Sequence, residues 1–376
     1  MKKRILNKVL FLYLSAFGIT GGIEKFNRSM LKALHELSVD GIIDAGAISV
    51  YDALPDERYF TNSRFRGCRG TKYLFVLNAI LCSFKYKTVI IGHINLATVA
   101  FLIKKLNPSV RLITIAHGIE VWRQLSWSKR WLLEKSDLVL AVSNFTRDKI
   151  AEYNSKVLKD RILVFPNTLD PYFVVPSNFK KPEYLMRRYG IPDTMNILLT
   201  VTRLASNERY KGYDTLIKLM PQLLSRNKEF GYIICGKGDK EEIIRIEAMT
   251  AKSDSMSSIK LVGFIPDSEL TDHYLLADIY VMVSKGEGFG IVFIEALACG
   301  RRVIAGSMDG SVDALLNGEL GKLVDPDNEE EILKAIGDSL YAGQHDPYSI
   351  QKLTLETFGF PKFKQRLCEH LGLSTL

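Results

Sequence analysis

The chain alternates short apolar runs with helical stretches, and this alternation restricts the fold more than any other feature. Six apolar runs lie in the first half, at residues 9–14, 47–51, 88–92, 111–116, 138–143 and 162–166. Six more lie in the second half, at residues 197–202, 231–235, 259–263, 279–284, 302–306 and 321–325. Strands that are apolar along their whole length are covered on both faces, so each set predicts a parallel sheet between helices. We therefore expect an α/β protein with two doubly wound domains.

The segment between the two sets is rich in Pro, Asn and Asp, which is typical of a linker. We place an N-terminal domain at residues 1–175, the linker at 176–190 and a C-terminal domain at 191–346. The tail, residues 347–376, is predicted to be helical and to pack back on the N-terminal domain. A chain of 376 residues is long enough for two such domains.

The first 18 residues allow two interpretations. A basic start followed by a short apolar run resembles a signal peptide. The alternative is a buried first strand at residues 9–14, then a glycine loop and a helix from about Ile23. We favour the strand, because an amphipathic helix follows directly, as in a βα unit. Five cysteines without zinc-like spacing predict reduced thiols in a cytoplasmic protein, and no run reaches the roughly 18 apolar residues of a membrane span.

The net charge of +8 is distributed unevenly. Residues 1–170 contain 26 Lys+Arg and 14 Asp+Glu, a net charge of +12, and the remainder has a net charge of −4. A basic N-terminal half indicates an anionic partner, which could be nucleic acid, a lipid surface or a phosphorylated substrate.

Ligands of open parallel sheets bind outside the carboxyl ends of the strands. Arg203 lies at the end of the run 197–202, and Lys211 and Gly212 immediately precede the next helix. Two cations beside the exposed N–H groups of a helix start form a pyrophosphate site. Either residue alone would be interpreted as a solvated surface charge, but the pair favours a functional site.

The stretch SKGEGFGIVFIEALACG, residues 284–300, joins a glycine loop to an apolar helix. Glycines let the backbone approach a ligand closely, and the start of the helix favours an anion. Glu287 lies in the loop, and Glu295 lies about two helical turns further on in an apolar setting. A carboxylate in that setting needs partners, which could be ribose hydroxyls or a structural arginine. Spacing alone leaves both alternatives open.

This stretch resembles the signature of glycosyltransferase family 4, a family of retaining, sugar-nucleotide-dependent enzymes with the GT-B fold. Matches along nearly the whole chain support the resemblance: Gly21-Gly22, AHGIE at 116–120, VSNFTRD at 142–148, PNTLD at 166–170, the Arg203 and Lys211-Gly212 pair, and LLADIYVMVS at 275–284. The gap between Arg203 and Lys211 is longer than the commonest family spacing, and we interpret SNERY as an insertion in the loop. The resemblance implies two Rossmann-like domains that face a central cleft.

The resemblance also implies catalytic roles for four residues. Arg203 and Lys211 would neutralise the leaving diphosphate, Glu287 would hold the donor sugar, and His117 would lie beside that sugar. Protein cations would take the place of a metal, so no cofactor is expected. Retention would come from attack on the same face of the sugar, with the leaving phosphate accepting the proton of the acceptor. A covalent mechanism with Glu287 as the nucleophile is the less favoured alternative.

Further residues are implied to bind the donor. They comprise the N-domain loop that closes on the phosphates, the backbone at the start of the apolar helix and the ribose ligand: Gly21, Gly22, Gly288, Phe289, Gly290, Ile291 and Glu295. The stretch 264–270, with Phe264, Ile265 and Leu270, is implied to line the base. The DxD-like Asp325-Pro-Asp327 is expected to end a strand and cap a helix rather than bind a metal.

Residues 58–73 carry five cations among aromatic residues. Nucleic acid can be bound in this way, but a lipid-diphosphate acceptor or a membrane surface fits the family better, and a solvated loop is the plain alternative. We therefore expect no nucleic-acid partner and take Arg64, Arg66 and Arg69 as candidate acceptor ligands. His93 follows a strand and is a further candidate, against a purely structural histidine.

All three tryptophans, Trp122, Trp127 and Trp131, lie in one basic stretch. Such a stretch fits an interfacial helix or one that packs on the core, and the sequence leaves both open.

The favoured function is transfer of a sugar from a UDP-, GDP- or ADP-sugar to a polysaccharide, oligosaccharide or lipid-linked acceptor in glycan or cell-envelope biosynthesis. Alternatives are a sugar-nucleotide epimerase of the same fold, or a non-catalytic binder of sugars or nucleic acid. The expected location is the cytoplasm, with peripheral contact at the inner face of an anionic membrane as an open alternative.

Overall fold

The computed structural model describes residues 7–18, 20–157, 159–226, 229–252, 255–341 and 345–373, and these residues form two compact units. Unit 1 comprises the described residues up to Pro171 and from Gly359 on, and unit 2 comprises Tyr172–Phe358. Residues 1–6, the basic start of the signal-peptide interpretation, and Ile19 of the predicted glycine loop lie outside the described residues. The predicted first strand is present as β1 (Asn7–Tyr13), which is buried from Val9 onward.

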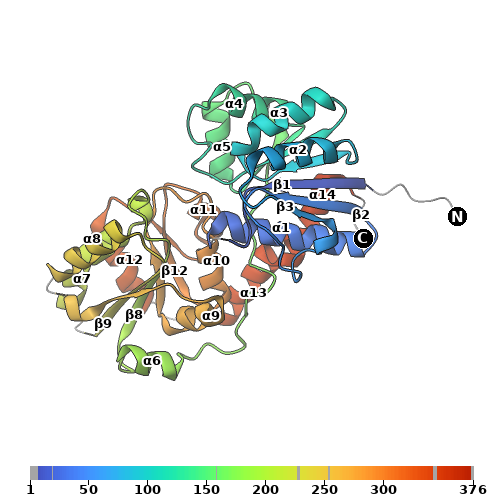
Figure 1. Cartoon of the computed structure of the whole chain (residues 1–376). Helices are drawn as coiled ribbons and strands as arrows, with labels where there is room; N and C mark the ends of the chain where they lie inside the picture. The colour runs from blue at the N-terminus through green and yellow to red at the C-terminus, as the bar shows by residue number, and fades with distance from the viewer. Residues whose placement is uncertain are drawn as a thin grey trace. The chain divides into compact units, whose positions relative to one another are not determined.

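Unit 1 contains a parallel sheet with the strand order β3-β2-β1-β4-β5-β6-β7. The other strands are β2 (Ile43–Ser49), β3 (Phe65–Gly67), β4 (Thr88–Ile91), β5 (Arg111–Ala116), β6 (Leu138–Ala141) and β7 (Ile162–Val164). Its helices are α1 (Gly22–Val39), α2 (Lys72–Ser83), α3 (Ala97–Leu106), α4 (Trp127–Lys135), α5 (Asn144–Tyr153) and α14 (Phe360–Leu371). Figure 1 shows α1 and α14 on one face of this sheet and α2 to α5 on the other.

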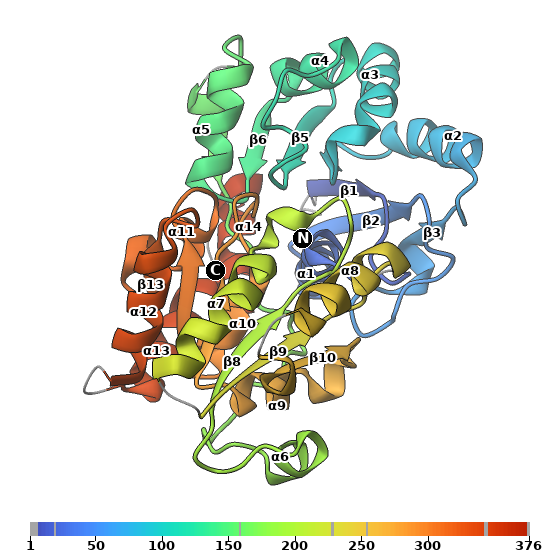
Figure 2. The same cartoon turned by 90° about the vertical axis from the view of Figure 1, so that its left-hand side faces the viewer.

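Unit 2 contains a second parallel sheet with the order β10-β9-β8-β11-β12-β13. The strands are β8 (Asn196–Val201), β9 (Phe230–Cys235), β10 (Ile259–Gly263), β11 (Ile279–Met282), β12 (Arg302–Gly306) and β13 (Lys322–Val324). The helices are α6 (Glu183–Tyr189), α7 (Tyr213–Arg226), α8 (Lys240–Ala251), α9 (Asp267–Leu276), α10 (Ile291–Ala298), α11 (Ser311–Ala314), α12 (Glu329–Tyr341) and α13 (Pro347–Phe358). Helices α7, α8 and α12 cover one face, and α9, α10 and α13 cover the other (Figures 1 and 2).

The two doubly wound sheets confirm the predicted fold class, and all twelve predicted strands are present. Strand β3 was not predicted, because it is three residues long at the sheet edge and only Phe65 is buried. Strand β2 starts at Ile43, four residues before the predicted run, because Asp44 and Gly46 weaken the apolar signal. The segment predicted as the linker contains helix α6, which Gly190 ends with a φ of 59°.

The predicted helical tail divides between the two units. Helix α14 packs on unit 1 as expected, since Phe363 lies between Phe26, at a ring-centroid distance of 5.7 Å, and Phe165, at 4.5 Å. Arg111 donates hydrogen bonds of 3.2 and 2.9 Å to the carbonyls of Leu371 and His370 at the end of that helix. Helix α13, which was also expected to pack back, instead belongs to unit 2 and contacts α10.

The strand order fixes where ligands can bind. In both sheets the order of the chain reverses beside the first strand, between β1 and β4 in unit 1 and between β8 and β11 in unit 2. In open parallel sheets, ligands bind near such switch points, at the carboxyl ends of the strands. No helix in the described ranges is long and apolar enough to cross a membrane.

The packing of α14 makes a prediction about the stability of unit 1. Phe363→Ala should lower the free energy of unfolding of this unit by about 3–5 kcal/mol, because it leaves a cavity between Phe26 and Phe165. Urea unfolding followed by tryptophan fluorescence reports this unit, since Trp122, Trp127 and Trp131 all lie in it. Phe358→Ala is the matched control, because Phe358 is equally buried but lies in unit 2. Equal effects of both variants on the fluorescence transition would contradict the assignment of α14 to unit 1.

Candidate functional site

The loop after β8 is held directly against the end of β11. Its last turn is the 3-10 helix η4 (Arg209–Lys211), followed by Gly212 with a φ of +84° and then by α7. A side chain at Gly212 would overlap the carbonyl group of Val283, so the backbones of the two loops touch. Only glycine combines this φ with such an approach, and the contact brings Lys211 beside the glycine loop that follows β11.

Lys211 forms an ion pair with Glu287. Both side chains are largely buried, with exposed fractions of 12 and 14 %. The ammonium group also lies 5.1 Å from the ring centroid of Tyr210. Burial alone would lower the pKa of Lys211, but the Glu287 carboxylate and the neighbouring Tyr210 and Glu208 outweigh burial and raise it. The pair is therefore charged, and each member depends on the other for compensation.

Arg203 lies two residues beyond β8 and pairs with Glu208. Its side chain is 55 % exposed. Glu208 belongs to SNERY, the stretch we interpreted as an insertion, and so does Arg209, which is 2.9 Å from Glu241 and 3.2 Å from the buried Glu242 of α8. The longer loop is therefore held by two sets of contacts, between Arg203 and Glu208 and between Arg209 and helix α8. Glu208 lies between Arg203 and Lys211 in the chain.

A second loop, which follows β12, holds the glycine loop that follows β11 through hydrogen bonds to Glu287. The buried Asp309 accepts hydrogen bonds from the backbone N–H of Glu287 at 2.7 Å and of Ser311 at 2.9 Å. The N–H of Gly310 donates to the carbonyl of Glu287 at 2.8 Å, and a side chain at Gly310 would overlap the carbonyl of Gly288. Burial raises the pKa of Asp309 to about 6. Our sequence analysis missed this aspartate, although its position after a strand next to β11 could have identified it.

Helix α10 begins at Ile291 and has Gly290 as its N-cap, with a φ of +85°. The cap makes no side-chain hydrogen bond, so the first N–H groups of the helix face the glycine loop without a capping side chain. Phe289 is buried against Phe358, at a ring-centroid distance of 5.4 Å, and contributes its backbone rather than its ring to the loop surface.

Glu295 is fully buried and accepts a hydrogen bond of 2.8 Å from the Tyr274 hydroxyl of α9. Arg301, the arginine that follows it most closely in the chain, donates to the backbone carbonyls of Cys299, Leu275, Ala277 and Phe179. A tyrosine hydroxyl thus binds the carboxylate that the sequence analysis assigned to ribose or to a structural arginine.

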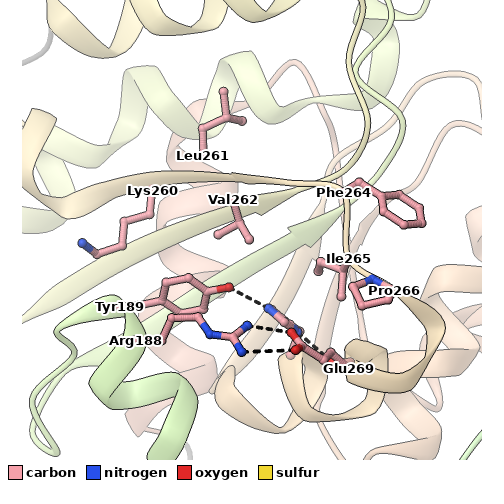
Figure 3. Close-up of a pocket in the computed structure, with 10 residues that line it drawn as sticks. Arg188, Tyr189, Lys260, Leu261, Val262, Phe264, Ile265, Pro266 and Glu269 are labelled. Carbon is pink, nitrogen blue, oxygen red and sulfur yellow. Dashed lines mark hydrogen bonds and ion pairs between the residues drawn. The ribbon is translucent and has the colours of Figure 1, made fainter.

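The predicted base loop borders a pocket of about 660 Å³. Phe264 is 57 % exposed, whereas Ile265 and Leu270 are buried. Phe264 and Ile265 line the pocket together with residues of α6, β10 and α9 (Figure 3). A bidentate pair of Arg188 with Glu269, at 2.7 and 3.1 Å, joins α6 to α9 in the lining of this pocket. Leu270 does not line the pocket and instead faces the interior of unit 2.

In unit 1 the loop after β1 is held by a buried aspartate. Asp52 accepts hydrogen bonds from the hydroxyl of Ser15 at 3.0 Å and from the N–H groups of Ala16 at 2.8 Å and Phe17 at 3.1 Å. The loop leads to Gly21, the N-cap of α1, and to Gly22, its first residue. The predicted glycines therefore lie at the start of a long helix at the switch point of unit 1. Asp52 was not found from the sequence.

His93 and His117 lie side by side after β4 and β5, with ring centroids 6.1 Å apart. The Nε2 of His117 donates to the carbonyl of Gly92 at 2.8 Å, and the Nδ1 of His93 accepts from the N–H of Asn95 at 3.0 Å. Burial lowers the pKa of both rings, that of His93 to about 3. Both histidines are therefore neutral near pH 7, with tautomers fixed by these backbone contacts.

The candidate arginine ligands lie apart from these histidines. Arg64 precedes β3 and is 3.4 Å from Asp44, Arg66 donates to Asn78 at 3.0 Å, and Arg69 follows β3. Strand β3 is the edge strand, and β2 and β1 lie between it and β4, the strand that His93 follows. Arg64 and Arg69 also lie at opposite ends of β3, because residues 58–73 contain a strand rather than one continuous loop.

The structure also shows the surroundings of the three tryptophans and of the DxD-like stretch. Trp122 and Trp131 pack against the core, whereas Trp127 is 60 % exposed. Asp327 pairs with Lys285, and the cap of α12 is Asn328, which accepts from the N–H of Glu331 at 3.1 Å; the expectation that Asp327 caps this helix was wrong. No group of three or more His, Cys, Asp or Glu that could hold a metal occurs in the parts of the chain that the structure covers.

Comparison with known proteins agrees with this arrangement. A model of Glycosyltransferase Family 4 matches residues 20–173, and a model of Glycosyl transferases group 1 matches residues 183–346. The chain belongs to glycosyltransferase family 4. Two solved structures of low identity have the same two-domain GT-B fold as this family member. Anabaena HepE has a TM-score of 0.79 at 18 % identity, covering 97 % of this chain and 99 % of its own. A glycosyltransferase of Rickettsia africae has a TM-score of 0.77 at 21 % identity, covering 98 % of both chains.

Curated relatives of this family 4 chain match over shorter stretches. A GDP-mannose-dependent alpha-(1-6)-phosphatidylinositol monomannoside mannosyltransferase of Mycolicibacterium smegmatis is 28 % identical over 242 residues, 61 % of each chain. A D-inositol 3-phosphate glycosyltransferase of Corynebacterium jeikeium is 27 % identical over 212 residues, 55 % of this chain and 49 % of its own. The matched part thus spans about half to three-fifths of these relatives.

The raised pKa of Asp309 predicts a specific pH dependence. A buried acid with a raised pKa binds its proton more tightly in the folded state, so its contribution to stability falls as the pH rises from the ordinary 3.8 through about 6. The loss should reach about 3 kcal/mol. The Asp309→Asn variant loses one hydrogen-bond acceptor, which lowers its free energy of unfolding by the same amount at every pH. Its free energy of unfolding relative to wild type should therefore rise by up to about 3 kcal/mol between about pH 4 and about pH 7.

Urea unfolding of wild type and variant at several pH values, followed by circular dichroism, measures this difference. Asp193→Asn, at an exposed position, is the control. A pH-independent difference for Asp309→Asn would contradict the buried, protonatable carboxyl.

Proposed function

We propose that this chain is a retaining glycosyltransferase that moves a sugar from a nucleoside-diphosphate sugar to a glycan or lipid-linked acceptor in glycan or cell-envelope biosynthesis. The observation that carries the proposal is the buried Lys211–Glu287 pair at the switch point of unit 2, beside the uncapped start of α10. The names of similar proteins support it, since a curated relative is GDP-mannose-dependent and HepE was crystallised with UDP and glucose.

The ion pair gives the donor diphosphate a defined way to bind. Without donor, Glu287 compensates the charge of Lys211 in a setting that excludes most water. A diphosphate brings two or more negative charges and would replace Glu287 as the partner of Lys211. The released carboxylate could then accept hydrogen bonds from sugar hydroxyls. A single exchange of partners at Lys211 would therefore bind both the diphosphate and the sugar of the donor. Arg203, which is more exposed, would approach the diphosphate from the other side of the loop.

The reaction breaks the bond between the anomeric carbon and the phosphate oxygen. Positive charge develops on the sugar and negative charge on the departing diphosphate, which Arg203, Lys211 and the N–H groups of Gly288, Phe289 and Gly290 would stabilise. The acceptor hydroxyl attacks on the face that the phosphate leaves. Its proton passes to a phosphate oxygen, so the products are the glycosylated acceptor and the nucleoside diphosphate.

In unit 1, we propose that His117, Gly21 and Gly22 bind groups of the donor and that His93 binds the acceptor. His117 is neutral, so it can contact a sugar hydroxyl without adding a positive charge near the developing oxocarbenium ion. Gly22 has open space around it, whereas the Glu24 side chain lies beside Gly21; we propose that a donor phosphate binds at Gly21 and Gly22, at this start of α1. His93 neighbours His117 and is proposed to meet the acceptor.

Glu295 would bind the ribose. Its Tyr274 hydrogen bond would orient the side chain, and a carboxylate can accept several hydrogen bonds at once, including one from a ribose hydroxyl. Phe264 and Ile265 of the base loop would lie against the nucleobase. We further propose that the reaction needs no metal ion, that the protein is cytoplasmic and that it contacts an anionic membrane peripherally.

A panel of UDP-, GDP- and ADP-sugars tests donor binding directly. At a donor concentration about 100 times the dissociation constant, the right donor should stabilise the protein by about 2.7 kcal/mol, which thermal denaturation detects. The corresponding free sugars serve as controls. If no nucleotide sugar raises the melting temperature, the proposed function fails.

Two variants separate binding from catalysis. Glu295→Gln keeps the acceptor for Tyr274 but loses the charge, so it should weaken donor binding by roughly 10-fold or more. Arg203→Ala should lower kcat by about 10²-fold or more with a smaller effect on donor affinity, because it acts on charge that develops in the transition state. Arg226→Ala is the control, since Arg226 is exposed at the last position of α7, at the opposite end of that helix from Lys211. Wild-type kinetics for both Glu295→Gln and Arg203→Ala would refute the site.

Chelation tests the proposed role of the protein cations. Turnover in the presence of EDTA should equal turnover with added Mg²⁺ or Mn²⁺, while anomeric analysis of the product should give the configuration of the donor. If chelation abolishes activity and an added metal restores it, that metal, rather than Arg203 and Lys211, neutralises the leaving diphosphate.

A further inference from the structure

The stretch SNERY, residues 206–210, lengthens the loop that follows β8. Two of its residues hold the loop in place, since Glu208 pairs with Arg203 and Arg209 pairs with two glutamates of α8. A third residue, Tyr210, contacts the glycine loop that follows β11. The added length of the loop therefore places an aromatic side chain at the candidate site.

Tyr210 contacts the glycine loop in two ways. Its carbonyl accepts a hydrogen bond of 3.0 Å from the N–H of Lys285. A side chain at Gly286 would come within 2.7 Å of Cδ2 and 2.9 Å of Cε2 of the Tyr210 ring, so the ring lies directly against the backbone of Gly286. The ring is therefore fixed beside the residue that precedes Glu287.

The same ring contacts Lys211. The Nζ of Lys211 lies over the Tyr210 ring, 5.1 Å from its centroid, a distance at which the negative face of an aromatic ring attracts a cation. The Lys211 side chain has an exposed fraction of only 12 %, and such an attraction is stronger where water is excluded. Burial raises the pKa of the Tyr210 hydroxyl, so this partner of Lys211 is neutral near pH 7.

We propose that Tyr210 is a positioning residue, whose ring holds the Lys211 ammonium in place while a donor diphosphate replaces Glu287. This role rests on the proposed function, because the exchange takes place only if the ligand is a diphosphate. The diphosphate and Glu287 are both anions and compete for the same cation. A neutral ring does not compete with the diphosphate, so Lys211 can keep it as a partner throughout the exchange.

A lysine needs such a support more than an arginine does. Its stem of four carbons is flexible, and its ammonium is a point charge without the fixed geometry of a guanidinium. Once Glu287 turns to the sugar, a contact that the donor does not displace is needed to keep the ammonium directed at the phosphates. The Tyr210 ring is itself fixed by its packing on Gly286, so it can supply this contact.

A double-mutant cycle separates this role from simple packing of the ring. Calorimetry measures the binding of UDP, GDP and ADP to wild type, Tyr210→Leu, Lys211→Met and the double variant. Leucine fills much of the space of the ring without its π-electrons, and methionine keeps most of the lysine stem without its charge. Tyr210→Leu should weaken binding of the preferred nucleoside diphosphate about 5- to 30-fold when Lys211 is present, and less than about twofold in the Lys211→Met background.

Three further variants test the contact. Tyr210→Phe keeps the ring and should bind within about threefold of wild type, because the ring rather than the hydroxyl attracts the ammonium. Gly286→Ala should weaken binding as Tyr210→Leu does, because the added methyl would displace the ring. Tyr153→Leu is the matched control and should bind like wild type, since the ring of Tyr153 lies 5.7 Å from the Nζ of Lys149 on α5 of unit 1.

Urea unfolding of the same cycle measures the contact without any donor. Tyr210→Leu should raise the unfolding equilibrium constant at least about fivefold more when Lys211 is present than in the Lys211→Met background. Equal effects in the two backgrounds, in unfolding or in binding, would overturn the proposal by showing that the ring only packs.

Failure of this inference can be told from failure of the proposed function. If wild type binds none of UDP, GDP and ADP, the proposed function fails and the role of Tyr210 fails with it. If wild type binds one of them and the Tyr210→Leu effect does not depend on Lys211, only the role of Tyr210 is rejected.

Discussion

The ion pair of Lys211 with Glu287 is the interaction on which the candidate site depends. It joins the loop after β8 to the loop after β11, the two strands on either side of the switch point in unit 2. A largely buried charge without a partner is costly, so neither loop can move away alone unless another charge takes the vacated position. A donor diphosphate has the charge to do so. The same contact that stabilises the ligand-free loops therefore selects for an anionic ligand.

Close backbone packing around this pair explains where the glycines occur. Gly212 touches the end of β11, Gly286 lies on the ring of Tyr210, and Gly310 lies under the carbonyl of Gly288. Three loops from neighbouring strands thus pack closely, through backbone contacts at Gly212 and Gly310 and against the Tyr210 ring at Gly286. Buried carboxylates fix the stack, since Asp309 binds the N–H of Glu287 and Glu242 binds the Arg209 end of the η4 loop. The resulting surface consists of N–H groups and a few charged side chains in fixed positions, which suits a ligand with phosphates and hydroxyls.

Much of this arrangement could be predicted, because its determinants are local in sequence. Continuous apolar runs gave both sheets, and the rule that ligands bind at the carboxyl ends of strands pointed to Arg203, Lys211 and Glu287. Hydrogen-bond partners that lie far apart in the chain could not be predicted. Nothing near Asp309 or Asp52 in the chain reveals which N–H groups they accept, and nothing near Glu295 reveals Tyr274. Strand β3 was missed because three residues at an edge carry almost no periodic signal.

The central claim is that a nucleoside diphosphate competes with Glu287 for Lys211, and calorimetric titration of UDP, GDP and ADP into wild type and Glu287→Gln tests it most directly. Removing the competing charge leaves Lys211 uncompensated, so the account predicts tighter binding of the preferred nucleoside diphosphate to the variant. The same variant should turn over the full sugar donor more slowly, because the sugar loses its carboxylate. Weaker or unchanged binding of every nucleoside diphosphate, together with undiminished turnover, would contradict the account.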